Sequence, residues 1–386
     1  MRLAGDVPSA TVITPFDDYP IHQIGAPLAV PATSDANAYD RFFFNGYVAD
    51  GSVYFGLALG LYPNRGVIDS SFSVMYDGTQ TSVHASGRCP DDRTLTSVGP
   101  IRVDIVEPMR VHRVTVEAAE HHLRADLVFT ARTAPVQEPH FLRRHATRTF
   151  MDYTRFTQFG SWSGWIEVEG ERIDVDSLVI VGSRDRSWGV RPVGEQPPTA
   201  PVGNRQFYWL WAPVNFESLC THFDVNEEIS GERWHESGFI VPLGNQLPLP
   251  AAVDYALDWE AGGRWAKRFV LQLTPYASAP YRVVLEPFLV FPMRGIGYGH
   301  PTRRHGGWVD EHSVVGESWP LPITESTNPG NVHIQALCRA TLTHPDGRIE
   351  HGTGILEQLV IGPHAPSGFA GLVDGAAPGA TAGTLT

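Results

Sequence analysis

A period-two alternation of apolar and polar residues recurs along the first half of the chain and constrains its fold most strongly. Within residues 101–105, isoleucine and valine alternate with Arg102 and Asp104, and residues 123–130 repeat the pattern. Successive side chains of a β-strand point to opposite faces, so each run predicts a strand with one apolar and one wet face. Short turns separate the runs, which favours an antiparallel meander. We therefore expect an all-β protein.

The composition fits such a fold and narrows the possible partners. Of the 386 residues, 42% are hydrophobic and 18% charged, so the chain can bury a large core. Its 38 glycines and 31 prolines favour many turns and few long helices. Phosphate binding needs a basic surface, whereas the formal net charge is −13, so we expect no nucleic-acid partner.

The cysteines and the N-terminal residues bear on the cellular compartment. Cys89, Cys220 and Cys338 are far apart and form no CxxC pair, which fits a reducing cytoplasm and argues against a disulfide framework. Residues 1–6 lack the apolar stretch of a signal peptide, and no run approaches the ~18 apolar residues of a membrane span. We expect a cytoplasmic protein without a membrane span, and its oligomeric state stays open.

A segment rich in proline and glycine, which follows Pro192 and runs through Gly203, is interpreted as a domain linker. It separates an N-terminal β domain (residues 1–192) from a C-terminal β domain (residues 193–365). Residues 366–386 are rich in glycine, alanine, proline and threonine and are predicted to form a disordered tail. The sequence RFFF at 41–44 opens the first domain much as QFYW at 206–209 opens the second, which favours two related barrels. Barrels of about eight strands can enclose one hydrophobic ligand.

A dense charged cluster follows the apolar run that ends at Val181. Asp185 lies between Arg184 and Arg186, and Arg191 follows, so we expect a strand that ends at a site or at a salt-bridged corner. In an extended chain the two flanking arginines share one face, and Asp185 lies on the other. The carboxylate then has two interpretations. It forms an Arg–Asp staple between the halves of the protein, or it points into an apolar interior where burial raises its pKa and makes it a proton donor.

His222 and Asp224 are two apart in a predicted strand and so share a face. Such a pair could handle a proton, or it could lie on the solvated face of the strand. Cys220 shares the same face and is interpreted as a core residue.

Aromatic residues gather around the charged cluster. Trp209 and Trp211 share one face of a predicted strand, with Tyr208 on the other, and Trp162 lies upstream. Aromatic walls beside one carboxylate suit an enzyme that protonates an alkene, because the rings stabilise a carbocation. They suit a passive hydrophobic pocket equally well.

Several cofactor motifs are absent from the sequence. It has no GxGxxG after a strand, no GxxxxGK[ST], no GxSxG and no HExxH, so we expect no cofactor. The two HxxxxH segments that begin at His140 and His300 have paired arginines and no supporting acid or cysteine at the usual spacing. We therefore expect no metal site.

The segment from Asp185 to Gly189 resembles the Asp-His-Asn-x-Gly segment of the carotenoid 1,2-hydratase (hydroxyneurosporene synthase) group in the CrtC/AttH-like superfamily. In that group a Trp-x-Trp also follows, here residues 209–211. The resemblance implies two tandem lipocalin-like β-barrels and, for Asp185, the role of the acid/base aspartate, with Trp162 as a pocket residue. The family's tyrosine is replaced by Ser183, and its His-Asn by Arg186 and Ser187.

These observations predict a cofactor-independent lyase or isomerase that acts on a hydrophobic, isoprenoid-like small molecule in an apolar pocket shared by the two barrels. The alternative is a lipid-binding protein without chemistry. The candidate catalytic residues are Asp185, His222 and Asp224. The candidate substrate-binding residues are Trp162, Trp188, Tyr208, Trp209, Trp211, Arg184 and Arg191.

Overall fold

The structure is a computed structural model that describes residues 14, 17, 19–177, 179–193 and 206–385. These residues form two antiparallel sheets joined by turns and short 3-10 helices, and no α-helix occurs among them. The expected all-β class is therefore confirmed. Within this part of the chain, no helix is long and apolar enough to cross a membrane. Residues 194–205, which hold most of the predicted linker, lie outside the described part.

The first sheet is strongly curled and open, with β5 at one edge and β21 at the other. Its β5 edge approaches β3 and β4, so the sheet wraps around its own core as an open barrel whose edges do not pair. Its 14 strands are β1 (Ala38–Val48), β2 (Val53–Tyr62), β3 (Val67–Tyr76), β4 (Thr79–Arg88), β5 (Ser97–Val98), β6 (Ile101–Glu107), β7 (Val111–Ala118), β8 (Leu123–Ala131), β9 (Val136–Gln137), β10 (Phe141–His145), β11 (Arg148–Val168), β12 (Glu171–Asp174), β13 (Ile180–Val190) and β21 (His312–Pro320).

The second sheet closes into a barrel, because β17 pairs with both β16 and β18 while β14 and β15 together occupy one strand position. Its ten strands are β14 (Phe207–Trp211), β15 (Val214–Asn215), β16 (Leu219–Glu227), β17 (Arg233–Pro242), β18 (Leu249–Trp259), β19 (Ala266–Pro275), β20 (Tyr281–Pro292), β22 (His333–Thr343), β23 (Ile349–Ile361) and β24 (Thr381–Thr384). The 3-10 helices are η2 (Pro63–Arg65), η3 (Ala119–His121), η4 (Val175–Ser177), η5 (Met293–Ile296), η6 (Pro329–Asn331) and η7 (Ala365–Ser367).

Apolar side chains fill the interior of each domain. Phe44, Leu57 and Phe129 belong to the first core, and Leu210 and Phe269 to the second. The meander β6–β8 alternates buried and exposed residues as its sequence predicts. β1, by contrast, is buried along nearly its whole length, because the core covers one face and the second barrel covers the other.

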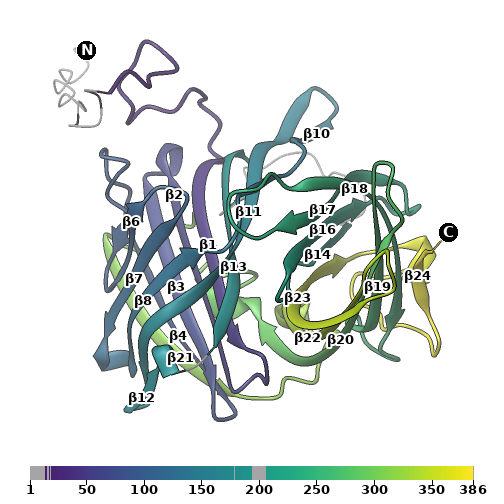
Figure 1. Ribbon diagram of the computed structural model, residues 1–386. Helices are drawn as coiled ribbons and strands as arrows, with labels where there is room; N and C mark the ends of the chain where they lie inside the picture. The colour runs from purple at the N-terminus through teal and green to yellow at the C-terminus, as the bar shows by residue number, and fades with distance from the viewer. Residues whose placement is uncertain (1–13, 15–16, 18, 178, 194–205, 386) are drawn as a thin grey trace, which may run out of the picture.

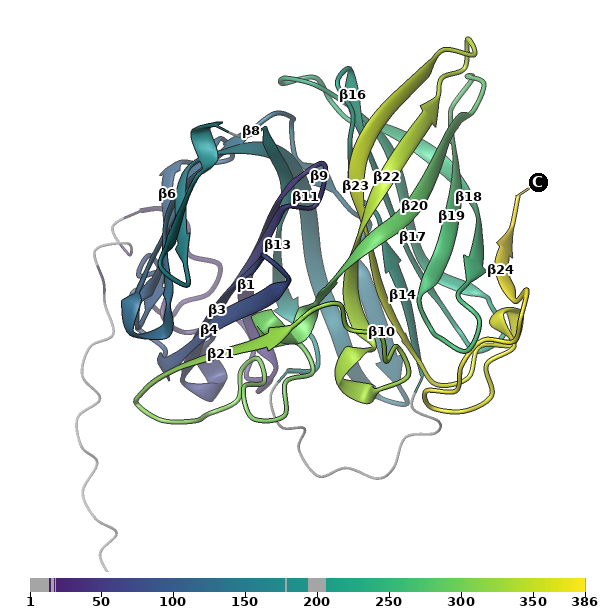
Figure 2. The same cartoon turned by 90° about the horizontal axis from the view of Figure 1, so that it is seen from below.

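The two domains pack side by side through the outer faces of their sheets (Figure 2). β1, β13 and β11 of the first domain face β14, β16 and β23 of the second. The rings of Phe43 and Trp211 meet edge to face across this interface, with centroids 6.1 Å apart. Arg132 donates from Nη1 to Oδ1 of Asn215 over 3.0 Å. The interface therefore combines ring packing with hydrogen bonds between side chains.

One strand crosses from the second half of the chain to the first domain. After β20 and η5, the chain adds β21 to the edge strand β4, with His312 opposite Gly87 and Pro320 opposite Thr79 (Figures 1 and 2). The sequence assigns all of residues 193–365 to the second domain, and β21 is the exception. Its partner strand lies more than two hundred residues upstream, so no local pattern could predict the pairing. β21 also covers an edge that would otherwise be open to pairing.

The predicted disordered tail is ordered in the structure as far as residue 385. β24 pairs with β18, and the loop before it is held by the buried Arg264, which donates from Nε to the Asp374 carbonyl over 2.7 Å. Arg264 also donates to the carbonyls of Gly362 and Gly371, each over 3.0 Å. The prediction of disorder rested on low-complexity composition, which does not show that a distant arginine binds the segment.

Candidate active site between the two barrels

Asp185 lies in the middle of β13, opposite Phe43 of β1 and Thr157 of β11. The strand continues to Val190, so the expectation that it ends at the charged cluster is wrong. Residues directly opposite in adjacent strands point to the same face. Asp185 therefore points toward the second barrel.

The two flanking arginines point to the other face and have partners of their own. Arg184 donates from Nε to Gln158 Oε1 over 2.9 Å, whereas Arg186 bonds Asp40 and lies 3.9 Å over the Phe42 ring. Among the described residues, the Asp185 carboxylate makes no hydrogen bond or ion pair. The Arg–Asp staple that the sequence left open is therefore absent from this part of the chain.

Burial raises the pKa of the Asp185 carboxyl, and the nearby positive charges of Arg155, Arg41 and Arg191 oppose that rise. The side chain nevertheless keeps some accessible surface, so it is not sealed in packed protein. A deep carboxyl with a raised pKa and no fixed partner can both take up and release a proton.

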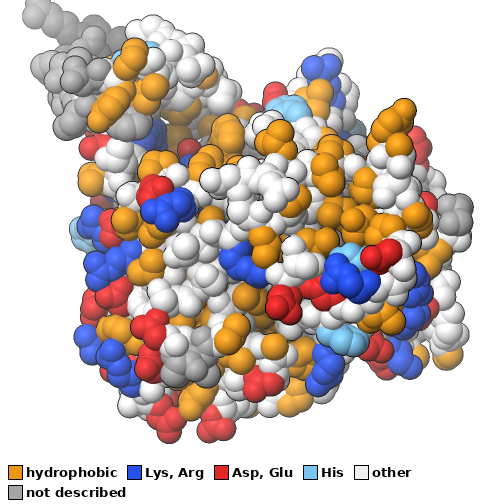
Figure 3. Space-filling model, in the orientation of Figure 1, with side chains coloured by type: hydrophobic (Ala, Val, Ile, Leu, Met, Phe, Trp, Pro, Cys, Tyr) orange, Lys and Arg blue, Asp and Glu red, His pale blue; other side chains and the backbone are white. Residues whose placement is uncertain are grey.

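A cavity of about 420 Å³ opens between the barrels beside this face. The three arginines whose charges act on Asp185 (Arg41, Arg155 and Arg191) all line it, whereas Asp185 is not among the lining residues. Among the described residues, no Asp or Glu belongs to the lining. On the face drawn in Figure 3, in contrast, acidic and basic side chains are interspersed. The lining residues are Arg41, Met151, Tyr153, Arg155, Arg191, Pro192, Val193, Phe207, Trp209, Asn226, Gly297, Tyr298, Gly299, Arg304, His305, His333 and Leu359.

Arg41 reaches the cavity from β1 and is 1% exposed. Its Nη2 donates to Nε2 of His305 over 2.8 Å, and its guanidinium lies 4.4 Å from the centroid of the Tyr298 ring. Burial, followed by the charge of Arg41, lowers the pKa of His305 to about 4, so the imidazole is neutral at neutral pH. The other ring nitrogen, Nδ1, lies 3.4 Å from Asp69. Arg41 therefore meets a neutral ring and no carboxylate in direct contact.

Arg155 connects the cavity to a buried acidic cluster. It donates from Nε to Glu138 over 2.5 Å and from Nη2 to Asp224 over 3.1 Å. His222 Nε2 lies 3.2 Å from Asp224 Oδ1, and His235 Nε2 lies 2.9 Å from Asp224 Oδ2. Asp224 thus holds three basic side chains around one carboxylate.

The pKa values of the two acids in this cluster, Glu138 and Asp224, are shifted in opposite directions. Burial raises the pKa of Glu138. It also opposes ionisation of Asp224, but His235, His222 and Arg155 outweigh burial and lower the pKa of that carboxyl. The cluster therefore favours an ionised Asp224 beside a Glu138 that more readily holds a proton.

The structure brings some predicted site residues together. Trp209 and Arg191 line the cavity, and Trp211 is buried against Phe43, the neighbour of Asp185. His222 and Asp224 are in contact and fully buried at the domain interface, so the alternative of a solvated face is wrong. Arg155 connects them to the cavity.

Four predicted substrate-binding residues lie elsewhere. Trp162 is inside the first core, where Nε1 donates to the Asn45 carbonyl over 2.8 Å, and Tyr208 is inside the second, stacked on His364. Arg184 and Trp188 lie on the face of β13 opposite to Asp185. Side chains alternate along a strand, so Tyr208 could not share a face with Trp209 in β14. For the same reason, Trp188 could not share a face with Asp185 in β13.

A larger cavity, of about 840 Å³, lies at the open end of the first sheet and is lined by Phe42, Leu61, Ile105, Arg186 and Trp188 among others. Asp185 points away from it. We place the candidate site in the smaller cavity, because three of its arginines act on the unpartnered carboxylate.

The sequence analysis did not identify five residues as part of the site: Arg41, Arg155, Glu138, Tyr298 and His305. Arg41 and Arg155 each directly precede a phenylalanine, but their strands contain other polar residues, so no pattern in the sequence distinguishes either arginine.

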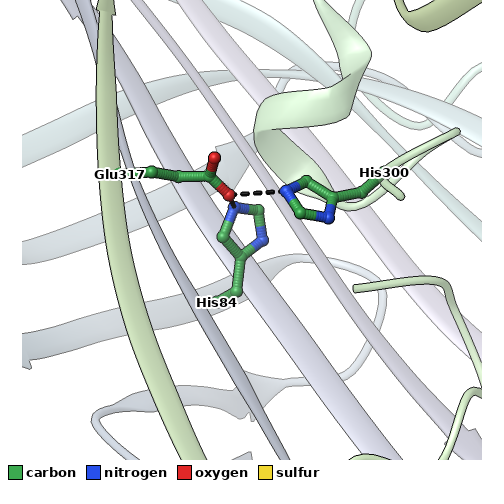
Figure 4. A group of neighbouring side chains, drawn as sticks. All are labelled: His84, His300 and Glu317. Carbon is green, nitrogen blue, oxygen red and sulfur yellow. Dashed lines mark hydrogen bonds and ion pairs between the residues drawn. The ribbon is translucent and has the colours of Figure 1, made fainter. Parts of the chain in front are cut away.

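A separate cluster unites His84 of β4, His300 and Glu317 of β21 (Figure 4). Both imidazoles point at Oε1 of Glu317, with Nε2 at 3.1 Å for His84 and 2.6 Å for His300. The backbone N–H of Arg303 donates to His300 Nδ1 over 2.9 Å, so the neutral ring carries its proton on Nε2. A metal ion would need a lone pair at that nitrogen. The cluster is therefore better suited to fastening β21 to β4 than to binding a metal.

Comparisons with known proteins bear on the fold. The family model described as "Family of unknown function (DUF8625)" matches residues 13–370. No curated protein matches the chain significantly.

Solved structures with a similar fold have low sequence identity to this chain. Kievitone hydratase from Nectria haematococca has a TM-score of 0.52 at 12% identity, covering 86% of this chain and 93% of its own. CghA with Sch210972 has a TM-score of 0.50 at 11% identity, covering 84% and 89%. An AttH-like protein from Nitrosomonas europaea has a TM-score of 0.49 at 13% identity, covering 93% and 100%. The likeness to kievitone hydratase and CghA bears on the fold alone and agrees with the expected tandem β-domains.

Proposed function

The chain belongs to the DUF8625 family, whose function is unknown, and we propose that it is a cofactor-independent lyase or isomerase. Its substrate is a hydrophobic small molecule bound between the two barrels. Asp185 transfers a proton to or from a carbon atom of that substrate. The reactions within this proposal are hydration, dehydration, a double-bond shift or cyclisation.

The observation that carries the proposal is the Asp185 carboxylate without a partner. A purely structural acid at a buried interface is normally paired, as Asp224 is here. Burial raises the pKa of Asp185 above its ordinary value, the direction that suits a carboxyl group that exchanges protons with a substrate. Aromatic side chains, Phe207, Trp209 and Tyr298, form part of the adjacent cavity wall and suit an apolar substrate.

The charges around the cavity favour one type of intermediate. Three arginines near Asp185 would destabilise the carbocation that the aromatic residues alone suggest, and they would stabilise negative charge on an oxygen atom. In the proposed step, the Asp185 carboxylate removes a proton from the carbon next to a carbonyl, and the electron pair moves onto the carbonyl oxygen. As the carbonyl re-forms, the electron pair moves back along the carbon skeleton. The protonated Asp185 returns the proton to the far carbon of a neighbouring double bond, which shifts that double bond, or the carbon–oxygen bond of a β-hydroxyl breaks and the departing hydroxide takes the proton and leaves as water. An isoprenoid skeleton remains within the proposal if it carries a carbonyl or acid group.

The similar structures support the reaction class through the fold. Kievitone hydratase is named for a hydration reaction, and CghA was solved with the small molecule Sch210972 bound. We further propose a cytoplasmic location, which is supported by the three free cysteines, Cys89, Cys220 and Cys338.

The proposal is tested by incubating the purified protein with a panel of unsaturated isoprenoid acids, ketones and alcohols and analysing the ligands by native mass spectrometry and gas chromatography. We expect one class to return as an isomer or with the mass of one water gained or lost. Asp185→Asn should abolish that change, whereas Asp126→Asn at an exposed ion pair should not. Ligands that bind and return unchanged would instead identify a carrier.

A further inference from the structure

Arg41 is a buried arginine whose hydrogen-bonding capacity is largely unused. Within the described ranges, its Nε and Nη1 are buried and have no partner, and its one hydrogen bond goes to a neutral imidazole. Arg264 is buried to a similar extent but is saturated, since it bonds four backbone carbonyls and the Asp374 carboxylate. Arg41 therefore lacks the partners that a buried guanidinium normally has.

A second arginine, Arg191, lines the cavity without a carboxylate in contact. Among the described residues, its guanidinium makes no hydrogen bond or ion pair, and it lies 4.7 Å from the centroid of the Tyr39 ring. A guanidinium presents its donors in a planar fork that matches a carboxylate or phosphate. Arg41 and Arg191 thus offer free donors in one cavity, and no acidic residue of the described part of the chain lines it.

Part of the remaining wall is apolar, beside the polar Arg155, Arg304 and Asn226. Phe207, Trp209, Met151 and Leu359 contribute to the apolar part. A ligand that fits must therefore present an anionic group to the arginines and an apolar skeleton to this wall. A neutral hydrocarbon would leave the guanidinium donors unsatisfied, which is unfavourable in a water-poor site.

We propose that the substrate is an amphipathic organic anion whose carboxylate or phosphate binds Arg41 and Arg191 while its apolar skeleton lies against Phe207 and Trp209. This inference rests on the proposed function, because it assigns the substrate class of the same site. Arg41 and Arg191 act as binding residues, and Asp185 stays free for proton transfer. The negative charge of Asp185 weakens the binding of the anion.

The test uses three ligands with one skeleton: geraniol, geranic acid and geranyl monophosphate. Isothermal titration calorimetry should show that at least one anion binds the wild type about tenfold or more tightly than geraniol. The preferred anion distinguishes a carboxylate site from a phosphate site. Arg41→Gln and Arg191→Gln should each remove most of that preference, and Arg88→Gln at an exposed ion pair should leave it unchanged. Arg41→Lys, which keeps the charge, should retain part of it and serves if the glutamine variant fails to fold.

Two results would overturn the inference: geraniol binding as tightly as both anions, or no anion binding at millimolar concentration. The experiment needs no turnover, so it is independent of whether the protein is an enzyme. Asp185→Asn separates the two ideas further, because it should bind the preferred anion more tightly than the wild type while losing proton transfer. An anion preference in a protein without turnover would disprove the proposed function and leave the binding site intact.

Discussion

Arg155 of β11 donates from Nη2 to Oδ2 of Asp224 on β16 over 3.1 Å, and this buried ion pair joins the two domains. The same guanidinium also bonds Glu138, whose pKa is raised by burial, whereas the pKa of Asp224 is lowered by its basic neighbours in spite of burial. The negative charge of Asp224 therefore contributes more to the stability of the interface than that of Glu138.

We predict that Asp224→Asn lowers the free energy of unfolding by about 3–5 kcal/mol, because it leaves buried basic groups without their carboxylate. Glu138→Gln should cost less than half as much, since the amide resembles a protonated carboxyl. Urea denaturation at neutral pH measures both. Asp126→Asn, at a surface pair, is the control and should change stability by about 0–1 kcal/mol. Equal losses from the two buried variants would contradict this assignment of charge.

Asp185 should make the protein less stable at neutral pH than an asparagine would. Because burial raises its pKa in the folded state above the ordinary 3.8, the folded protein binds this proton more tightly than the unfolded chain. Stability therefore falls as pH rises from 3.8 through the folded pKa, and the full loss persists above it. Asp185→Asn should melt at a higher temperature than the wild type at pH 7, with a difference that vanishes below about pH 3.8. A lower melting temperature for the variant at pH 7 would reveal an ion pair that holds Asp185.

Arg41 and Arg264 provide a matched pair of buried arginines. In buffer without organic anions, Arg41→Met should raise the free energy of unfolding by up to about 2 kcal/mol, because it removes an incompletely paired buried charge. Arg264→Met should lower it by about 3–5 kcal/mol, because the carbonyls and Asp374 lose their donor. Differential scanning calorimetry of the two variants gives the comparison. If Arg41→Met lowered the free energy of unfolding as much as Arg264→Met does, the charge of Arg41 would already be compensated in the wild type.

The cluster of His84, His300 and Glu317 should fasten β21 to the first domain. The bonds from His300 and His84 lower the pKa of Glu317, so its contribution is present above its ordinary pKa of 4.5 and is lost as pH falls through the folded value. Glu317→Gln should reduce stability by about 1–2 kcal/mol and speed amide hydrogen exchange in β21 and β4. Exchange that accelerates equally in the second barrel would argue against a local role.

The same cluster predicts that zinc has no stabilising effect. Adding Zn²⁺ to the wild type should leave the melting temperature unchanged, because His300 donates its Nε2 proton to Glu317. A rise in melting temperature that Glu317→Gln abolishes would show that the three side chains bind the metal.

Period-two alternation was sufficient to predict the all-β fold, because that signal is local. It also placed Asp185 on the opposite face from Arg184 and Arg186. It could not predict what covers each face. Trp162 and Tyr208 point into the cores of their own domains, whereas Trp209 faces the neighbouring domain. When both faces of a strand are buried, the sequence does not show which face meets the domain's own core and which meets the neighbouring domain.

The rest of the site depends on contacts between distant segments. Arg41 meets His305, and Arg155 meets Asp224, across separations of 264 and 69 residues. β21 pairs with β4 over a similarly long range. Contacts between such distant residues produce no periodic pattern in the sequence. The cationic lining of the cavity could therefore be identified only from the structure.

The most direct test of the account is deuterium incorporation into the ligand. The wild type and Asp185→Asn are incubated in D₂O with α,β-unsaturated isoprenoid acids and ketones, and the recovered ligands are analysed by mass spectrometry for deuterium bound to carbon. The account predicts incorporation with the wild type and a rate lower by about a hundredfold or more with Asp185→Asn. Equal rates for the two proteins, or no incorporation with either, would contradict the claim that Asp185 transfers a proton to or from carbon.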